Sequence, residues 1–136
     1  MTEITNEKEK LQSLFASFQK ALGRLEETVK LSPTSVHKDA TIQRFEFTFE
    51  LAWKLMQSTA KYQGFEAKSP RESIRVAAQL GLIYDPEEWF EFLEARNLTA
   101  HTYNEPIADE VYQKAKEFLK AAKDFCEEVK KQTKND

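Results

Sequence analysis

The stretch TSVHKDATIQRFEFTFELAWKLMQSTAKYQ, residues 34–63, is a run of 30 residues without glycine or proline. Its central part, RFEFTFEL at residues 44–51, alternates apolar and polar side chains as a half-buried strand does. The run is much longer than a strand, and no turn residue interrupts it, so its length favours a helix. We therefore predict a helix over roughly residues 36–63.

The apolar residues of this helix form two neighbouring arcs at 100° per residue. The first arc consists of Ile42, Phe45, Phe49, Ala52, Met56 and Ala60, and the second of Leu51, Leu55 and Tyr62. Together they cover roughly 200° of the circumference, whereas a surface helix needs about 100°. We expect the helix to be central to its own bundle, with the second arc facing a second copy of the chain. The solvent-facing remainder is expected to hold Glu46, Glu50, Lys54, Gln57 and Lys61.

Four further helices are predicted around this one. Apolar residues recur at three- and four-residue steps over residues 5–31, and Ser32-Pro33 ends that helix. Ser69-Pro70-Arg71-Glu72 and Asp85-Pro86-Glu87-Glu88 each give an N-cap, a proline at the first helical position and an acidic capping residue. The last helix follows Glu105-Pro106. Three long and two short helices predict an all-α, up-and-down antiparallel bundle that forms one domain over residues 1–136.

Composition excludes several classes of protein. The chain has one cysteine, so a disulfide framework and a cysteine-based zinc site are excluded. The net charge of −3 is not that of a broadly basic nucleic-acid binder. No cluster of metal ligands or glycine-rich phosphate loop occurs, and we expect no metal or cofactor. No apolar run approaches the roughly 18 residues of a membrane span, and the polar start MTEITNEKEK is unlike a signal peptide, so we expect a soluble cytoplasmic protein.

The acidic excess is concentrated in residues 80–110, which carry eight acidic residues and a single cation, Arg96. Most of these acids lie where helices are predicted to begin, and the helix dipole favours anions there. Acids around Arg96 repel phosphate unless their carboxylates point elsewhere.

Polar side chains are crowded into ARNLTAHTYNE, residues 95–105, between the fourth and fifth predicted helices. If the fourth helix continued through this segment, Arg96 and His101 would stand about 140° apart around its axis. If the helix ends near Leu98 or Thr99, the chain can fold His101 back towards Arg96. Pro106 favours such a break.

An arginine and a histidine are a minimal set for metal-independent cleavage of RNA. His101 can take the proton of a ribose 2′-hydroxyl as a general base, and Arg96 can hold the phosphate with two donors. Asn97 can add a hydrogen bond. One histidine per chain leaves no general acid for the departing 5′-oxygen, but a two-fold dimer would supply a second His101.

A purely structural interpretation is also open. An arginine at a helix C-terminus is favoured by charge alone, a loop histidine often only caps a helix, and Tyr103 can pack between helices. Lys68, Arg71 and Arg75 form a modest basic patch on the third predicted helix, which would contact RNA, an acidic partner or only solvent.

Arg96-x4-His101-x-Tyr103 resembles the R-x4-H-x-Y motif of the HEPN superfamily, particularly its HepT branch. RNLTAHTYNE at 96–105, together with QRFEFTFELAWKL at 43–55, is similar to the nucleotidyltransferase substrate-binding proteins. The resemblance implies a HEPN-like four-helix core, a homodimer and a partner that is a minimal nucleotidyltransferase. In some such pairs the helical subunit is a ribonuclease toxin, and the nucleotidyltransferase is an antitoxin that transfers AMP to the motif tyrosine.

The resemblance assigns a role to each position of the motif. Arg96 and His101 would be catalytic, Asn97 a polar helper, and Tyr103 the modified or nucleotide-binding hydroxyl. The same resemblance allows a subunit without chemistry of its own, which presents a nucleotide or an acceptor substrate to the nucleotidyltransferase. The chain lacks the G-S-x10-D-x-D signature of nucleotidyltransferases, so the carboxylates for any nucleotide transfer must come from another chain. A third interpretation is a helical adaptor protein that has no nucleotidyltransferase as a partner.

Overall fold

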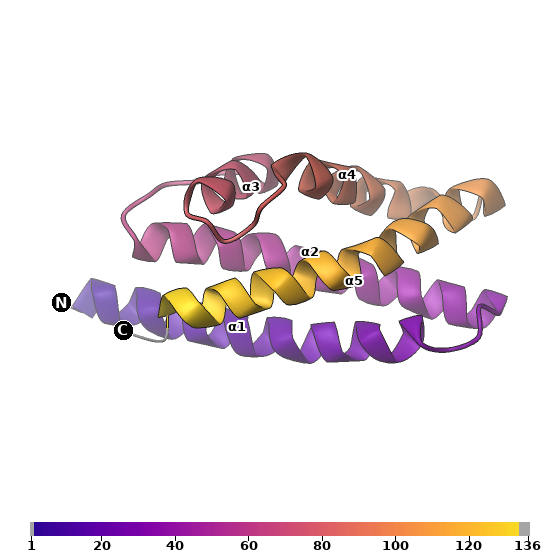
Figure 1. Cartoon of the computed structure of the whole chain (residues 1–136), viewed down its shortest axis with the longest axis horizontal. Coiled ribbons are helices and arrows are strands. Elements are labelled where there is room, and N and C mark those ends of the chain that lie inside the picture. The colour runs from indigo at the N-terminus through magenta and orange to yellow at the C-terminus, as the bar shows by residue number, and fades with distance from the viewer. Residues whose placement is uncertain (1, 134–136) are drawn as a thin grey trace.

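The structure is a computed structural model that describes residues 2–133, and all regular elements in this range are helices (Figure 1). In chain order they are α1 (Thr2–Val29), α2 (Ser35–Tyr62), α3 (Pro70–Gln79), α4 (Pro86–Asn97), the 3₁₀ helix η1 (Leu98–His101) and α5 (Glu105–Thr133). This arrangement confirms the predicted all-α fold. None of the helices in the described range is both long and apolar enough to cross a membrane.

The helices run up and down along one axis. In Figure 1, α1 and α2 are antiparallel, α3 and α4 follow each other back along the bundle, and α5 returns beside α1 and α2. Lys38 Nζ lies 3.1 Å from Asp109 Oδ1, which joins the starts of α2 and α5. Gln63 Nε2 donates to Gln132 Oε1 at 3.2 Å, which joins their ends. The α1–α2 and α4–α5 connections therefore lie at the same end of the bundle.

The predicted helix starts are confirmed by their caps. The side chains of Ser69 and Asp85 accept hydrogen bonds from the backbone N–H groups of Glu72 and Glu88, and a proline follows each cap. Glu72 Oε2 accepts from the backbone N–H of Lys68, one residue before the partner that a capping box uses. These local contacts fix where α3 and α4 begin.

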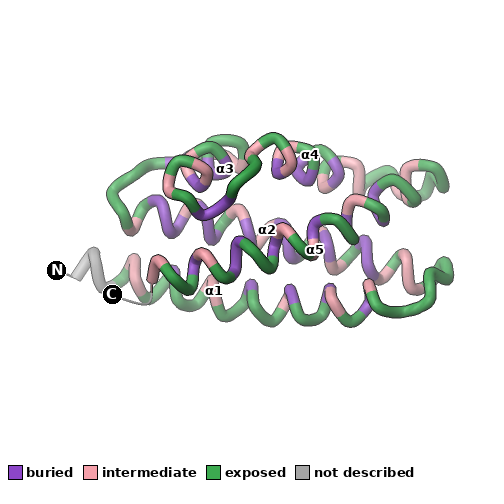
Figure 2. Tube along the Cα trace, viewed as in Figure 1, coloured by how far each residue is buried: buried purple, intermediate pink, exposed green. Residues whose placement is uncertain are grey.

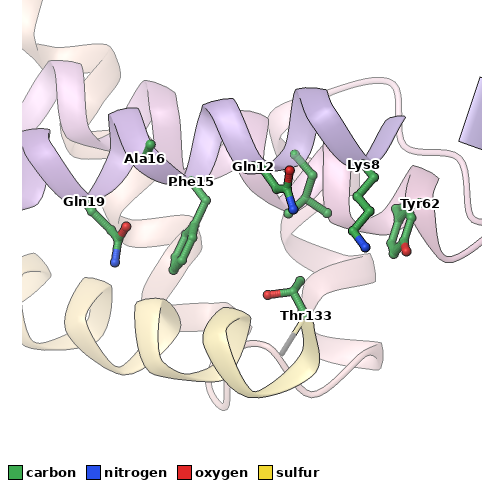
Figure 3. A pocket seen from close by; sticks show the side chains of 8 residues that line it. Lys8, Gln12, Phe15, Ala16, Gln19, Tyr62 and Thr133 are labelled. Carbon is green, nitrogen blue, oxygen red and sulfur yellow. The ribbon is translucent and has the colours of Figure 1, made fainter. Parts of the chain in front are cut away.

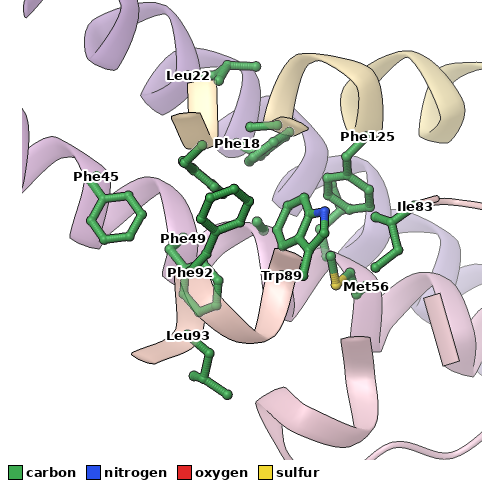
Figure 4. Packing of buried hydrophobic residues seen from close by; sticks show 14 of the residues in the cluster. Phe18, Leu22, Phe45, Phe49, Met56, Ile83, Trp89, Phe92, Leu93 and Phe125 are labelled. Carbon is green, nitrogen blue, oxygen red and sulfur yellow. The ribbon is translucent and has the colours of Figure 1, made fainter. Parts of the chain in front are cut away.

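The core is a cluster of aromatic rings contributed by α1, α2, α4 and α5 (Figure 4). The Phe118 ring on α5 lies at its centre, with centroids 5.2 Å from Phe45, 5.2 Å from Phe92 and 5.4 Å from Trp89. These pairs are edge-on, the geometry that the ring quadrupole favours by about 0.5–1.5 kcal/mol per pair beyond burial. The core therefore holds α2, α4 and α5 in a fixed relation, and the α4–α5 junction extends from it.

Helix α2 is central, as predicted, but its second apolar arc differs from the prediction. The residues of the first arc are all buried. Buried positions recur along the length of α2 in Figure 2. Leu55 was expected on an outer contact and is instead fully buried in the chain's own core, whereas Leu51 and Tyr62 are half-buried. Two large apolar side chains of α2 are exposed: Val36 in its first turn, and Phe47 in its middle, which is 52% exposed. Of the second arc, Leu55 therefore packs within the same chain, and Leu51 and Tyr62 remain partly exposed for a contact with another protein.

Candidate functional site

The motif residues lie where α4 passes into η1 and then into α5. Arg96 and Asn97 are the last two residues of α4, His101 ends η1, and Tyr103 precedes α5. The predicted break near Leu98 or Thr99 is thus confirmed as a change from an α-helix to a 3₁₀ turn.

Three of the polar residues in this segment hold the turn together. Thr99 Oγ1 donates to the Arg96 carbonyl at 2.7 Å, and Thr102 Oγ1 donates to the Thr99 carbonyl at 3.2 Å. Asn104 Oδ1 accepts from the N–H of Ile107 at 3.2 Å and so caps α5. The crowding of polar residues therefore has a structural cause at these three positions, and it leaves Arg96, Asn97, His101 and Tyr103 for other roles.

Arg96 faces α2. Its Nη1 lies 2.9 Å from Glu50 Oε1, and its guanidinium carbon lies 6.0 Å from the centre of the Phe49 ring. The side chain is 27% exposed, and its Nε is enclosed without a hydrogen-bond acceptor among the described residues. Glu50, expected on the solvent face of α2, is instead half-buried as the ionic partner of Arg96. The role of Glu50 could not be predicted from the sequence, because its contact with Arg96 joins residues of two helices that are 46 positions apart in the chain.

His101 and Tyr103 face outward at the end of the bundle. Tyr103 is 85% exposed, and its hydroxyl lies 3.5 Å from Nδ1 of His101, with the two rings edge-on at 6.0 Å. Tyr103 therefore does not pack between helices of this chain, and that structural interpretation is wrong. An exposed imidazole beside an exposed hydroxyl is accessible to a ligand or to a second protein.

The single chain does not bring Arg96 and His101 together. Within residues 2–133, no hydrogen bond, ion pair or ring contact joins them, because Arg96 turns to α2 while the 3₁₀ turn carries His101 outward. Asn97 is exposed, and its side chain makes no hydrogen bond to residues 6–133. Two of the four motif residues, His101 and Tyr103, are therefore adjacent, and the other two stand apart from them.

Two concave surfaces of the chain lie away from the motif. One, of about 150 Å³, is formed by α1, Tyr62 and Thr133 (Figure 3). The other is a groove of about 970 Å³ between α1, the second half of α2 and residues 64–67. Neither is lined by Arg96, His101 or Tyr103, so the motif forms an open surface rather than part of these cavities.

Lysines from other segments pair with some of the acids near the motif. Lys38 lies 3.1 Å from Asp109, and Lys114 lies 2.5 Å from Glu91. The hydrogen bond to Glu91 is the main cause that raises the pKa of Lys114 above its ordinary value. The acidic excess of residues 80–110 is therefore offset in part by lysines of α2 and α5, which reduces its repulsion of a phosphate.

These features define a class of protein: an all-helical bundle with an Arg-x4-His-x-Tyr motif at the junction before its last helix. The family model described as "nucleotidyltransferase substrate binding protein like" matches residues 13–131, and the chain belongs to this family. The family that the sequence motifs resemble is thereby confirmed.

Relatives and solved structures agree with this assignment. "Probable ribonuclease HepT" of Haemophilus influenzae is 31% identical over 100 residues, which span 70% of this chain and 68% of the relative. A crystal structure of a Thermus thermophilus protein has a TM-score of 0.75 and 37% identity, and covers 79% of this chain and 94% of its own. These matches include more than two-thirds of each chain.

Two further structures extend the comparison. A Haemophilus influenzae protein with the fold of a substrate-binding domain of a nucleotidyltransferase has a TM-score of 0.65 and 25% identity, and covers 90% of this chain and 98% of its own. A chain of a toxin–antitoxin structure with AMP-PNP has a TM-score of 0.64 and covers 88% of this chain and 96% of its own. The identity of the last pair is 15%, so this likeness shows a common fold alone.

Proposed function

We propose that this chain is the partner subunit of a minimal nucleotidyltransferase and that its homodimer cleaves RNA without a metal. The observation that carries the proposal is the exposed pair of His101 and Tyr103, with the hydroxyl 3.5 Å from the imidazole, in the turn that follows the Arg96–Asn97 end of α4. The similarity to "Probable ribonuclease HepT" supports the nuclease, and family membership supports the partner.

In the proposed reaction, His101 removes the proton of a ribose 2′-hydroxyl as a general base. The 2′-oxygen then forms a bond to phosphorus while the bond from phosphorus to the 5′-oxygen breaks. Arg96 contacts the non-bridging oxygens, where negative charge develops, and Asn97 adds a hydrogen bond there. Protonated His101 of the partner subunit gives its proton to the leaving 5′-oxygen. The products are a 2′,3′-cyclic phosphate and a 5′-hydroxyl.

The proposal requires a dimer because one chain keeps Arg96 and His101 apart and has no second histidine at the site. A two-fold axis near the α4–α5 junction would place two copies of each residue around one substrate phosphate. Phe47 and half-buried Leu51 on α2 are apolar residues that such a contact would cover.

We propose that Tyr103 is the nucleotide acceptor. Its hydroxyl oxygen would attack the α-phosphorus of ATP held by the nucleotidyltransferase, pyrophosphate would leave, and the hydroxyl proton would pass to a base of that enzyme. The 85% exposure of Tyr103 gives the second protein access to this oxygen.

A non-catalytic subunit that presents a nucleotide or acceptor substrate is the alternative. It is favoured by the ion pair between Arg96 and Glu50, which offsets part of the positive charge that a phosphate would meet. In that case the motif serves contact with the nucleotidyltransferase rather than catalysis.

Incubation of the purified chain with RNA in EDTA distinguishes the two functions. The nuclease predicts 2′,3′-cyclic phosphate ends, with a rate that falls about 10²–10⁴-fold in His101→Ala. The matched control is His37→Ala, which removes the other histidine of the chain and should leave the rate unchanged. Intact RNA together with a stable complex with the nucleotidyltransferase would contradict the nuclease and support the alternative.

A further inference from the structure

A carboxylate on α2 holds the guanidinium of the motif arginine. Glu50 Oε1 lies 2.9 Å from Arg96 Nη1, and the contact joins the middle of α2 to the last turn of α4. Both side chains are partly enclosed, at 32% and 27% exposure. We propose that Glu50 is a positioning residue for Arg96, an inference that rests on the proposed nuclease function.

The Glu50 carboxylate is itself held in place. Trp53, three residues further along α2, donates from its indole Nε1 to Glu50 Oε2 at 3.1 Å. Both carboxylate oxygens therefore have a neighbour, but the two contacts differ. Oε2 accepts the hydrogen bond from Trp53, whereas the enclosed Oε1 meets Arg96 as an ion pair without hydrogen-bond geometry. Two partners restrict the rotation of the Glu50 side chain, so the position at which it meets Arg96 is fixed by α2.

The contact leaves part of the guanidinium free. An arginine has five N–H donors in a planar fork, and the ion pair with Glu50 runs to the Nη1 group. The Nε of Arg96 is enclosed without an acceptor, and the Phe49 ring lies 6.0 Å from the guanidinium carbon. The Nη2 group makes no hydrogen bond to residues 6–133, which leaves it for a phosphate, and the ion pair at Nη1 restricts the direction in which it points. Since the contact does not use the whole fork, Glu50 can orient Arg96 without occupying its phosphate-binding donors.

A positioning role and a charge-screening role predict opposite kinetics. A fixed guanidinium lowers the barrier because it already stands where charge develops, so loss of Glu50 should lower kcat. If Glu50 only offset the positive charge, its loss should strengthen the binding of RNA and lower KM with kcat unchanged or raised. The direction of the change therefore identifies the role.

The test compares Glu50→Ala, Glu50→Gln and Trp53→Phe in the full chain, with a short RNA oligonucleotide as substrate in EDTA. We expect kcat to fall about 10–100-fold in Glu50→Ala with KM changed less than about threefold. Glu50→Gln removes the charge of the ion pair and should lower kcat nearly as much as Glu50→Ala, whereas Trp53→Phe should lower it less. The control is Glu46→Gln, one turn earlier on α2, because this carboxylate has no ion pair or side-chain hydrogen bond within residues 6–133, whose side chains the structure describes.

A second measurement does not depend on cleavage. The Nε–Hε correlation of Arg96, assigned with Arg96→Lys, reports by NMR whether the guanidinium is held. It should be sharp in the wild type and in Glu46→Gln, and broadened or shifted to the free-arginine position in Glu50→Ala and Glu50→Gln. An unchanged correlation, or a kcat that is unchanged or raised in Glu50→Gln, would overturn the proposal. If the wild type cleaves no RNA, the nuclease function fails while this correlation still decides whether Glu50 positions Arg96.

Discussion

Tyr103 and Tyr84 show how surroundings decide what an exposed hydroxyl can do. Tyr84 is 74% exposed, but its hydroxyl donates to Glu128 at 2.5 Å, which is the main cause that raises the pKa of Tyr84. Within residues 6–133 the Tyr103 hydroxyl has only the longer contact to His101, and the residue is 85% exposed. The hydroxyl of Tyr84 is occupied by Glu128, whereas that of Tyr103 has the greater exposure and only a long contact, so Tyr103 is the more accessible of the two to a second protein.

We predict that the nucleotidyltransferase, with ATP and Mg²⁺, adds one adenylate group to the wild-type chain and none to Tyr103→Phe. The bulky, charged adenylate would stand beside His101, so the modified chain should lose its cleavage of RNA. Intact-protein mass spectrometry measures the addition, and Tyr84→Phe is the matched control, which should be modified as fully as the wild type. A mass increase that survives Tyr103→Phe would place the acceptor elsewhere.

At the scale of the helices, local sequence signals were sufficient for most boundaries. Ser69 and Asp85 cap the helices that they were predicted to cap, and α2 runs without a break between Thr34 and Gly64. Gly64 and Gly81 have φ angles of +90° and +75°, which residues with a Cβ rarely adopt, and each follows the end of a helix. A helix cap or a helix break depends on residues within about four positions of each other, so both can be recognised from the sequence of one chain.

Contacts between helices could not be predicted in the same way. The partner of Arg96 and the burial of Leu55 depend on how α2 is rotated against α4 and its other neighbours, and periodicity gives the width of an apolar face without saying what covers it. The motif residues could therefore be identified from the sequence. The contact of Glu50 with Arg96, and that of Trp53 with Glu50, became visible only in the structure.

Glu88, the third residue of α4, also differs from the sequence-based expectation. An acid there was predicted to be stabilised by the helix dipole. Its pKa is instead raised above 4.5, first by burial and then by the charges of Asp85, Glu117 and Glu91, which outweigh the opposing effect of Lys114. The folded state therefore binds the Glu88 proton more tightly than the unfolded state does, so ionisation of Glu88 opposes folding.

We predict that Glu88→Gln stabilises the chain at neutral pH. Below the unfolded pKa near 4.5, Glu88 is protonated in both states and contributes no penalty; the penalty grows as the pH rises through the higher folded pKa. Allowing for solvent screening, Tm should rise by about 1–3 °C at pH 7, and the gain should shrink towards zero at pH 4. Thermal unfolding followed by circular dichroism measures this, with exposed Glu87→Gln as control. A gain that is equal at both pH values would contradict the assignment to Glu88 ionisation.

At the scale of the whole molecule, the motif lies at the junction of two helices, α4 and α5, that contribute rings to the aromatic core. Phe92 of α4 and Phe118 of α5 are fully buried, and their rings meet at 5.2 Å, edge-on. The α4–α5 junction, which carries His101 and Tyr103, is thus anchored on both sides by buried rings while its own side chains are exposed. A site made from two such junctions would have rigid supports, which a reaction that depends on the placement of two histidines requires.

The proposed dimer predicts how inactive subunits affect active ones. If each site needs a general base and a general acid from two copies of His101, a dimer with one His101→Ala subunit lacks one of them. After co-refolding of equal amounts of wild-type and His101→Ala chains, about a quarter of the dimers carry His101 in both subunits. The activity should therefore fall to about a quarter of that of the same total amount of wild-type protein. Refolding with His37→Ala should leave it unchanged. A fall to about a half would mean that each subunit acts alone, and the shared site would then be wrong.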